Sequence, residues 1–202
     1  MTKETHPIIR VYGNTQFKYF PIILVIGREP NCSAKFINEI GEYDFDKYPN
    51  CAFWNISYAT IGEAINKELN SKNLKNKFRS KGSSFIAYTD LCPQPILAKQ
   101  KGKKEIKNNI GLEVYEKHIN DILSHEDIIK RVDLIILSGL DKNNVKPEAL
   151  GLLKEKLTEK NKKFIEVPFF CGNNKNKIKE RIDKEKNIKN IIREIYQKWE
   201  DN

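Results

Sequence analysis

The chain has 202 residues, of which 39% are hydrophobic and 31% charged, and this length and composition are typical of one globular domain with its own core. No apolar run of about 18 residues occurs and residues 1–6 lack an apolar segment, so the sequence predicts neither a membrane-spanning helix nor a secretory signal. We expect a single domain over residues 1–202, cytoplasmic, monomeric and without a membrane partner.

The net charge is +9, from 36 basic and 27 acidic residues, and it favours a polyanionic partner such as DNA. A bias toward AT-rich codons can also produce this charge, since 30 of the basic residues are Lys and 21 residues of the chain are Asn. Two basic stretches, 67–81 and 97–107, are either contact surfaces or solvated faces. The four Cys residues include no Cys-x-x-Cys pair, so we expect reduced thiols and no metal site.

Strand-like and helix-like segments alternate along the chain. Residues 8–20 read as a short hairpin with Gly13-Asn14 at its turn. The apolar patterns that follow predict strands at 22–26, 84–89, 132–137 and 164–167. They also predict helices at 56–69, 147–157 and 175–199, and one or two helices at 112–131. This alternation predicts a three-layer α/β fold, with a central four-stranded parallel sheet flanked by helices and a short N-terminal hairpin.

Ligands of parallel sheets bind beyond the carboxyl ends of the strands, so the segments that follow the predicted strands are candidate site segments. The first contains Glu29, directly after the strand at 22–26. A carboxylate there is suited to act as a general base or an electrostatic stabiliser. It can equally cap a helix or face water.

Aromatic and acidic side chains mark the next two segments. Tyr43 and Phe45 lie in an expected loop, where aromatic rings can stack a planar ligand such as a base. Phe53 and Trp54 are either further stacking residues or core residues beneath the loop. Asp90 ends the strand at 84–89, where it either reads the edge of a ligand or holds a turn.

The last segment opens the C-terminal helix with Cys171, Gly172, Asn173 and Asn174, followed by Lys175. Backbone amides at a helix start attract anions such as phosphate, while Asn174 is also a typical N-cap residue. Lys99 and Lys101, in the second basic stretch, are further candidates for phosphate contacts. His118 and His125 lie seven residues apart, not the three or four typical of metal ligands on a helix, so no metal site is expected there.

Taken in order, these segments resemble the motifs of the uracil-DNA glycosylase superfamily, nearest its mismatch-specific thymine/uracil branch. The resembling segments are Gly27-Arg28-Glu29-Pro30-Asn31, Gly41-Glu42-Tyr43-Asp44-Phe45, Asn50-Cys51-Ala52-Phe53-Trp54, Tyr88-Thr89-Asp90-Leu91-Cys92-Pro93, Leu137-Ser138-Gly139 and the loop 168–174. The chain departs from the family in three places. Glu29 replaces the catalytic Asp or Asn, Asn31 stands where the family has Gly or Tyr, and the loop 168–174 contains neither His nor Ser.

The resemblance implies a DNA glycosylase that flips a damaged or mismatched base out of DNA and hydrolyses its N-glycosidic bond without a cofactor. In that interpretation Glu29 is catalytic, while Tyr43, Phe45 and Asp90 bind the base. Residues 171–175, Lys99 and Lys101 then contact DNA. The departures leave two alternatives open: an inactive nucleic-acid-binding or protein-binding module of the same fold, and a hydrolase of free nucleosides or nucleotides.

Overall fold

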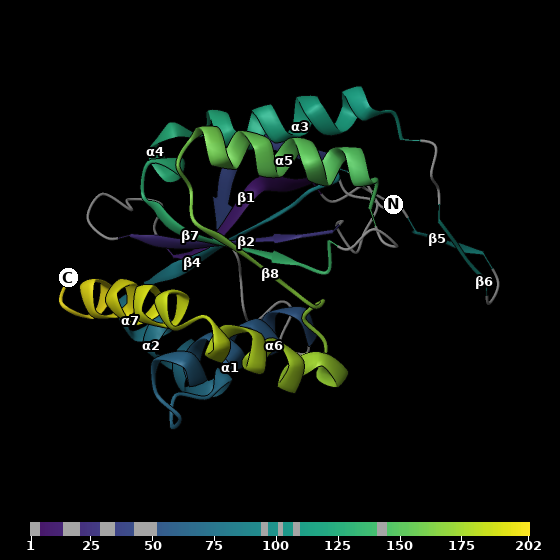
Figure 1. Ribbon diagram of the computed structural model, residues 1–202. Coiled ribbons are helices and arrows are strands. Elements are labelled where there is room, and N and C mark those ends of the chain that lie inside the picture. Colours follow the sequence, from purple (N-terminus) through teal and green to yellow (C-terminus); the bar gives the residue numbers. More distant parts are fainter. Residues whose placement is uncertain are drawn as a thin grey trace.

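The computed structural model describes residues 5–13, 21–28, 35–42, 52–93, 97–100, 103–106, 110–140 and 145–202. In this part of the chain, six strands form one sheet in the order β3-β1-β4-β2-β7-β8 (Figure 1). The six strands are β1 (Thr5–Gly13), β2 (Ile22–Gly27), β3 (Lys35–Glu42), β4 (Ser83–Asp90), β7 (Val132–Ser138) and β8 (Phe164–Val167).

Four neighbouring strands, β4, β2, β7 and β8, are parallel, and they are the four strands that the sequence predicts. The predicted strand number is nevertheless too small, because β1 joins the same sheet antiparallel to β4 and parallel to β3. β1 pairs along both edges, with β3 and β4, and the second half of the expected hairpin, residues 14–20, lies outside the described residues. Ile8, Ile9 and Val11 are at most 1% exposed, burial that an isolated two-stranded hairpin does not provide.

Helices cover both faces of the sheet, which confirms the layered α/β arrangement (Figure 1). One layer consists of α3 (Leu112–Ser124), α4 (Glu126–Ile129) and α5 (Pro147–Glu159). The other consists of α1 (Ala52–Ile65), α2 (Ser71–Lys81), α6 (Lys175–Lys184) and α7 (Lys186–Glu200). None of the helices in the described ranges combines the length and apolar content needed to cross a membrane.

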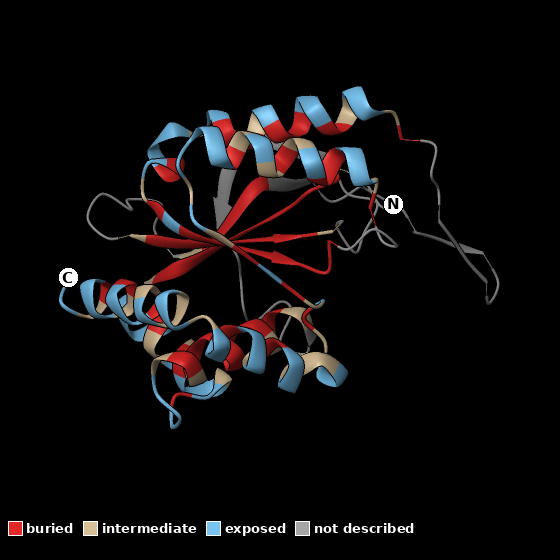
Figure 2. Ribbon diagram, in the orientation of Figure 1, coloured by how far each residue is buried: buried red, intermediate tan, exposed pale blue. Residues whose placement is uncertain are grey.

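The central strand β2 shows how the sequence builds two cores. Side chains of a strand point alternately to the two faces of the sheet. Ile22, Leu24 and Ile26 pack on the α3–α5 side, whereas Ile23 and Val25 pack on the side of α1, α2, α6 and α7. All are fully buried, as expected of a parallel strand covered on both faces (Figure 2).

The helices differ from the sequence prediction in three places. The helix predicted at 56–69 is α1, which begins and ends four residues earlier, at Ala52 and Ile65. α2 was not predicted, because only Leu74 and Phe78 of its 11 residues are buried. Its ends carry clear signals: the Asn70 side chain accepts a hydrogen bond from the Asn73 amide at 3.0 Å, and Gly82 follows the helix with φ +64°. The predicted helix at 175–199 is two helices, α6 and α7, separated at Glu185.

The second basic stretch contains a separate two-stranded antiparallel sheet, formed by β5 (Leu97–Gln100) and β6 (Lys103–Ile106). The sequence pattern did not predict these strands. Lys99 lies on β5 opposite Lys104 on β6. Only the backbone of these residues is described.

Candidate functional site

The parallel strands bring the four predicted site segments to one edge of the sheet. In the strand register Gly27 is opposite Asp90, Ile26 is opposite Leu137, and Ser138 is opposite Val167. The chain therefore leaves β2, β4, β7 and β8 at the same carboxyl edge, toward which the strand arrows of β2 and β8 point in Figure 1. This is the edge at which open α/β sheets bind their ligands.

Backbone hydrogen bonds hold these segments together beyond the strands. The amides of Leu91 and Cys92 donate to the carbonyls of Gly27 and Arg28, at 2.8 and 3.1 Å. Across the neighbouring pair of strands, the amide of Gly139 donates to the carbonyl of Val167 at 3.0 Å. The first residues after β2, β4 and β7 are thus tied to the sheet edge.

Two glycines permit close approaches at this edge. A Cβ atom on Gly27 would lie 2.7 Å from Oδ1 of Asp90, well inside van der Waals contact. Gly139 has φ +68°, and a Cβ atom there would lie 2.7 Å from the Cβ of Phe169. Glycine at both positions therefore allows Asp90 and Phe169 to sit directly against the backbone of the neighbouring strand end.

Asp90 is held by two contacts in the interior of this edge. Its Oδ2 accepts a hydrogen bond from Nη2 of Arg10 at 2.5 Å, and the two side chains are only 9% and 11% exposed. Its backbone carbonyl accepts a hydrogen bond from Nε2 of His118 at 2.9 Å. Burial lowers the pKa of His118, so its imidazole is neutral at pH 7. If Asp90 hydrogen-bonds to a base, as the sequence predicts, it does so while Arg10 is bound to its Oδ2 atom.

Aromatic rings gather around Phe53 at the start of α1. The Phe53 ring centre lies 5.1 Å from Trp54, 5.4 Å from Phe169 and 5.5 Å from Phe170. Trp54 is buried, with 9% of its surface exposed, and Phe53 packs against the same core, so both act as core residues beneath the edge. The guanidinium of Arg10 lies 5.5 Å from the Trp54 ring centre, which adds a cation–π contact to the buried ion pair.

Phe169 is the outermost ring of this cluster. It is 36% exposed, and only Leu112 is also a large exposed hydrophobic residue among those described. The guanidinium of Arg28 lies 5.9 Å from its ring centre. An exposed aromatic ring beside a cation at the ligand edge is an arrangement suited to a planar, negatively charged ligand.

The loop 168–174 folds back on itself before α6. Residues Gly172–Asn174 form a short 3₁₀ turn in which the Asn174 amide donates to the Cys171 carbonyl at 3.0 Å. Asn174 occupies the N-cap position of α6, but its side chain makes no capping hydrogen bond. Its Nδ2 instead donates to the carbonyl of Phe169 at 3.0 Å, so Asn174 fixes the backbone that carries the exposed ring.

The lysines at the start of α6 are paired with an acidic residue. Glu63 of α1 accepts hydrogen bonds from Lys175 at 2.6 Å and Lys179 at 3.1 Å. Burial raises the pKa of Glu63, but the hydrogen bonds and charges of the two lysines outweigh it and hold that pKa below its ordinary value. Both lysines remain about 40% exposed, at 38% and 42%, so a phosphate that contacts them competes with the Glu63 carboxylate.

Several predicted site residues lie outside the described residues. These are the proposed catalytic Glu29, the proposed stacking residues Tyr43 and Phe45, and Lys101, while Lys99 is described only in its backbone. Within the described residues, no cluster of three or more His, Cys, Asp or Glu side chains is arranged to hold a metal ion.

Sequence reasoning missed Arg10 and His118 as parts of this edge, and it included Phe169 in the loop 168–174 without assigning it a role. The one available signal was Arg10, a cation between Ile9 and Val11 in an apolar strand. A charge at such a position requires a buried partner, although the sequence does not say which.

Comparison with protein-family models and with curated proteins finds no match for this sequence. Among solved structures, the chain is similar to the solution NMR structure of a candidate uracil DNA glycosylase from Methanosarcina acetivorans. The identity is 15% and the TM-score 0.47, over 93% of this chain and 99% of that chain. A similarity at this level carries no information about activity, so membership of that family stays a prediction from the motifs.

Proposed function

We propose that this protein is a DNA glycosylase-like hydrolase that turns a damaged or mismatched base out of DNA and hydrolyses its N-glycosidic bond. The observation that carries the proposal is the meeting of the four strand-end segments at one sheet edge, with the exposed ring of Phe169 beside Arg28. A nucleotide offers a flat base and a negative phosphate, which match a ring and a cation.

Base flipping requires a grip on the DNA around the extruded nucleotide. Removing a base from the stack costs a few kcal/mol, least at a mismatched or damaged base. In the proposal, residues 171–174 enter the space that the base leaves, supported by the hydrogen bond from Asn174 to the Phe169 carbonyl. Lys175, Lys99 and Lys101 hold phosphates on either side.

Glu29 supplies the chemistry in this proposal. It follows Arg28, whose carbonyl is tied to the Cys92 amide at the sheet edge. Rupture of an N-glycosidic bond makes the sugar electron-poor, and a carboxylate near its C1′ atom stabilises that charge or activates a water molecule. Tyr43 and Phe45 stack the base.

Asp90 is proposed to select the base through its edge. An ionised carboxylate only accepts hydrogen bonds, so it favours a base that presents donors over one that presents two carbonyls. An Asp90→Asn enzyme whose base preference is unchanged, measured per folded molecule, contradicts this role.

The test is a panel of duplexes that contain uracil, hypoxanthine, xanthine or mismatched thymine, with alkali cleavage of the abasic product as the readout. We expect product from at least one duplex and at least about 100-fold less from Glu29→Gln, the lower bound for a lost acid–base or electrostatic group. The matched control is Glu116→Gln, which changes an exposed carboxylate on α3, in the layer of α3, α4 and α5. We expect this variant to keep full activity. Product formation that is unaffected by Glu29→Gln refutes the catalytic assignment.

The same experiment separates the two alternatives. Retarded DNA without product identifies a binding module, which the lack of His and Ser in the loop 168–174 favours. Cleavage of free nucleosides, with none in DNA, identifies a small-molecule hydrolase.

A further inference from the structure

The two helical layers carry opposite charge. The helices α1, α2, α6 and α7 together contain 14 basic and five acidic residues, a net charge of +9, whereas α3, α4 and α5 contain three basic and eight acidic residues, a net charge of −5. A coding bias toward Lys would enrich both layers. The positive charge is instead concentrated on one face of the molecule.

The helix α2 is the most basic element of this face. It has five basic residues and no acidic one. Lys72 and Arg79 are seven residues apart and therefore share one face of the helix. This face is turned away from the buried Leu74 and Phe78. Both are exposed, as is Lys67 in the preceding turn.

Other cations of α2 serve the fold. Lys81 donates to the carbonyls of Trp199 and Glu200 at 3.0 and 2.7 Å, at the end of α7. Lys77 forms an ion pair with Glu200 at 3.0 Å. Lys67, Lys72 and Arg79 are exposed, and Arg79 also donates a hydrogen bond to Oδ1 of Asn76 on the same helix at 3.3 Å. We call these three residues the α2 basic face.

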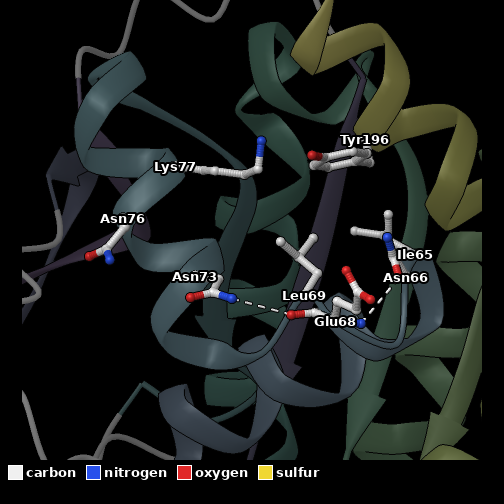
Figure 3. A pocket seen from close by; sticks show the side chains of 8 residues that line it. All are labelled: Ile65, Asn66, Glu68, Leu69, Asn73, Asn76, Lys77 and Tyr196. Atoms are coloured by element: carbon white, nitrogen blue, oxygen red, sulfur yellow. Dashed lines mark hydrogen bonds between the residues drawn. The ribbon is translucent and has the colours of Figure 1, made fainter.

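A groove of about 540 Å³ lies beside this face, between α2, the turn before it and α7 (Figure 3). Asn66, Asn73 and Asn76 belong to its lining, and Tyr196 contributes a phenol ring next to Lys77. One atom of each Asn amide already hydrogen-bonds within the protein: Oδ1 of Asn66 accepts from the Glu68 amide, Nδ2 of Asn73 donates to the Glu68 carbonyl, and Oδ1 of Asn76 accepts from Arg79, while the Asn76 amide points away from Tyr196 in Figure 3. Amides and a phenol are uncharged donors and acceptors that suit the sugars and bases of a nucleic acid. One carboxylate, Glu68, lies in the same lining.

We propose that the α2 basic face and its groove bind a nucleic acid strand, at a place separate from the sheet edge described above. Phosphates contact Lys67, Lys72 and Arg79, while the groove receives the neighbouring sugar or base. β4 spans the sheet from Ser83, just after α2, to Asp90 at the site edge, about 23 Å at the usual rise per residue. A membrane surface fits less well, because neither exposed large hydrophobic residue, Leu112 or Phe169, lies on this face.

The test measures binding of an undamaged single strand of about 20 nucleotides, and of its duplex, by fluorescence anisotropy between about 50 and 200 mM salt. Undamaged oligonucleotides need no bond cleavage, so the result is independent of glycosylase activity. Each lost phosphate contact lowers the slope of log K against log salt by about 0.7 for a single strand and 0.9 for a duplex. For the triple variant Lys67→Gln, Lys72→Gln, Arg79→Gln we therefore expect a slope smaller by about 2 to 3.

The matched control removes three exposed lysines near the acidic layer: Lys117→Gln, Lys130→Gln, Lys160→Gln. It has the same change in net charge, and we expect its slope to stay close to that of the original protein. Unchanged circular dichroism and melting temperature verify that both variants fold. The proposal is overturned if the two triples lower the slope equally, if the original protein does not bind either oligonucleotide, or if it binds only phosphatidylserine vesicles.

Discussion

The buried pair Arg10–Asp90 ties β1 to the candidate site, and its removal is expected to lower the free energy of unfolding substantially. The carboxylate is 9% exposed and the guanidinium 11%, with 2.5 Å between Nη2 and Oδ2. Asp90→Asn keeps the size of the side chain but removes its charge. Arg10 then stays inside the protein without its countercharge.

The expected cost follows from that burial. Two unit charges about 4 Å apart attract by about 4 kcal/mol at an effective dielectric constant of about 20. Removing one partner of a buried pair costs about 3–5 kcal/mol, because the remaining charge stays desolvated. Since domains are stable by only about 5–15 kcal/mol, this loss removes a large share of the free energy of unfolding.

Urea denaturation followed by circular dichroism measures the loss, through the shift in midpoint at constant m value. The matched control is Asp121→Asn, which breaks the exposed pair with Lys117 and costs no more than about 1 kcal/mol. The double variant Arg10→Gln, Asp90→Asn should be less destabilised than the sum of the single variants. If Asp90→Asn costs no more than Asp121→Asn, the pair does not stabilise this edge as argued.

Three further changes test neighbouring parts of the structure. Gly27→Ala places a methyl group 2.7 Å from the Asp90 carboxylate, and we expect it to lower the free energy of unfolding, measured by urea denaturation, by about 1–3 kcal/mol. The control is Gly151→Ala, on an exposed helical face with nothing within 4 Å, which should raise that free energy by up to about 1 kcal/mol. If Gly27→Ala and Gly151→Ala change the free energy of unfolding equally, the close approach of Asp90 to Gly27 is wrong. Because burial lowers the pKa of His118 from 6.5, the unfolded chain takes up a proton below about pH 6.5 that the folded protein does not. Stability therefore decreases as the pH is lowered below about 6.5, by at most about 1.4 kcal/mol per unit. His118→Gln should remove this part of the difference between urea titrations at about pH 7 and pH 5, and an unchanged difference would rule it out. Glu63→Gln releases Lys175 and Lys179, so oligonucleotide binding should tighten and its salt slope increase by about 1 to 2, while weaker binding would show that these lysines do not contact phosphate.

The sequence was most informative where apolar residues dominate a segment. β2 is a continuous apolar run, which is the pattern of a strand covered on both faces. β7 and β8 each contain one exposed acidic residue, Asp133 and Glu166, and β4 begins with two Ser residues, but the apolar residues that remain still indicated a strand. α2 escaped prediction because it buries only Leu74 and Phe78 and is otherwise polar, so its periodicity is weak. The break at Glu185 was also not predicted, although no apolar residue lies between Ile182 of α6 and Ile188 of α7.

The sequence alone determined the layered fold and the strand ends at which polar and glycine residues collect. Those features follow from local periodicity and from the rule that parallel strands end at one edge. Tertiary structure decided the rest: Arg10 reaches Asp90 across 80 positions of sequence, and Glu63 pairs with two lysines more than 100 positions away. Such partners depend on which strands and helices become neighbours, and a local pattern contains no information about that choice. The charge difference between the two helical layers has the same origin, because only the order of strands in the sheet assigns each helix to a face.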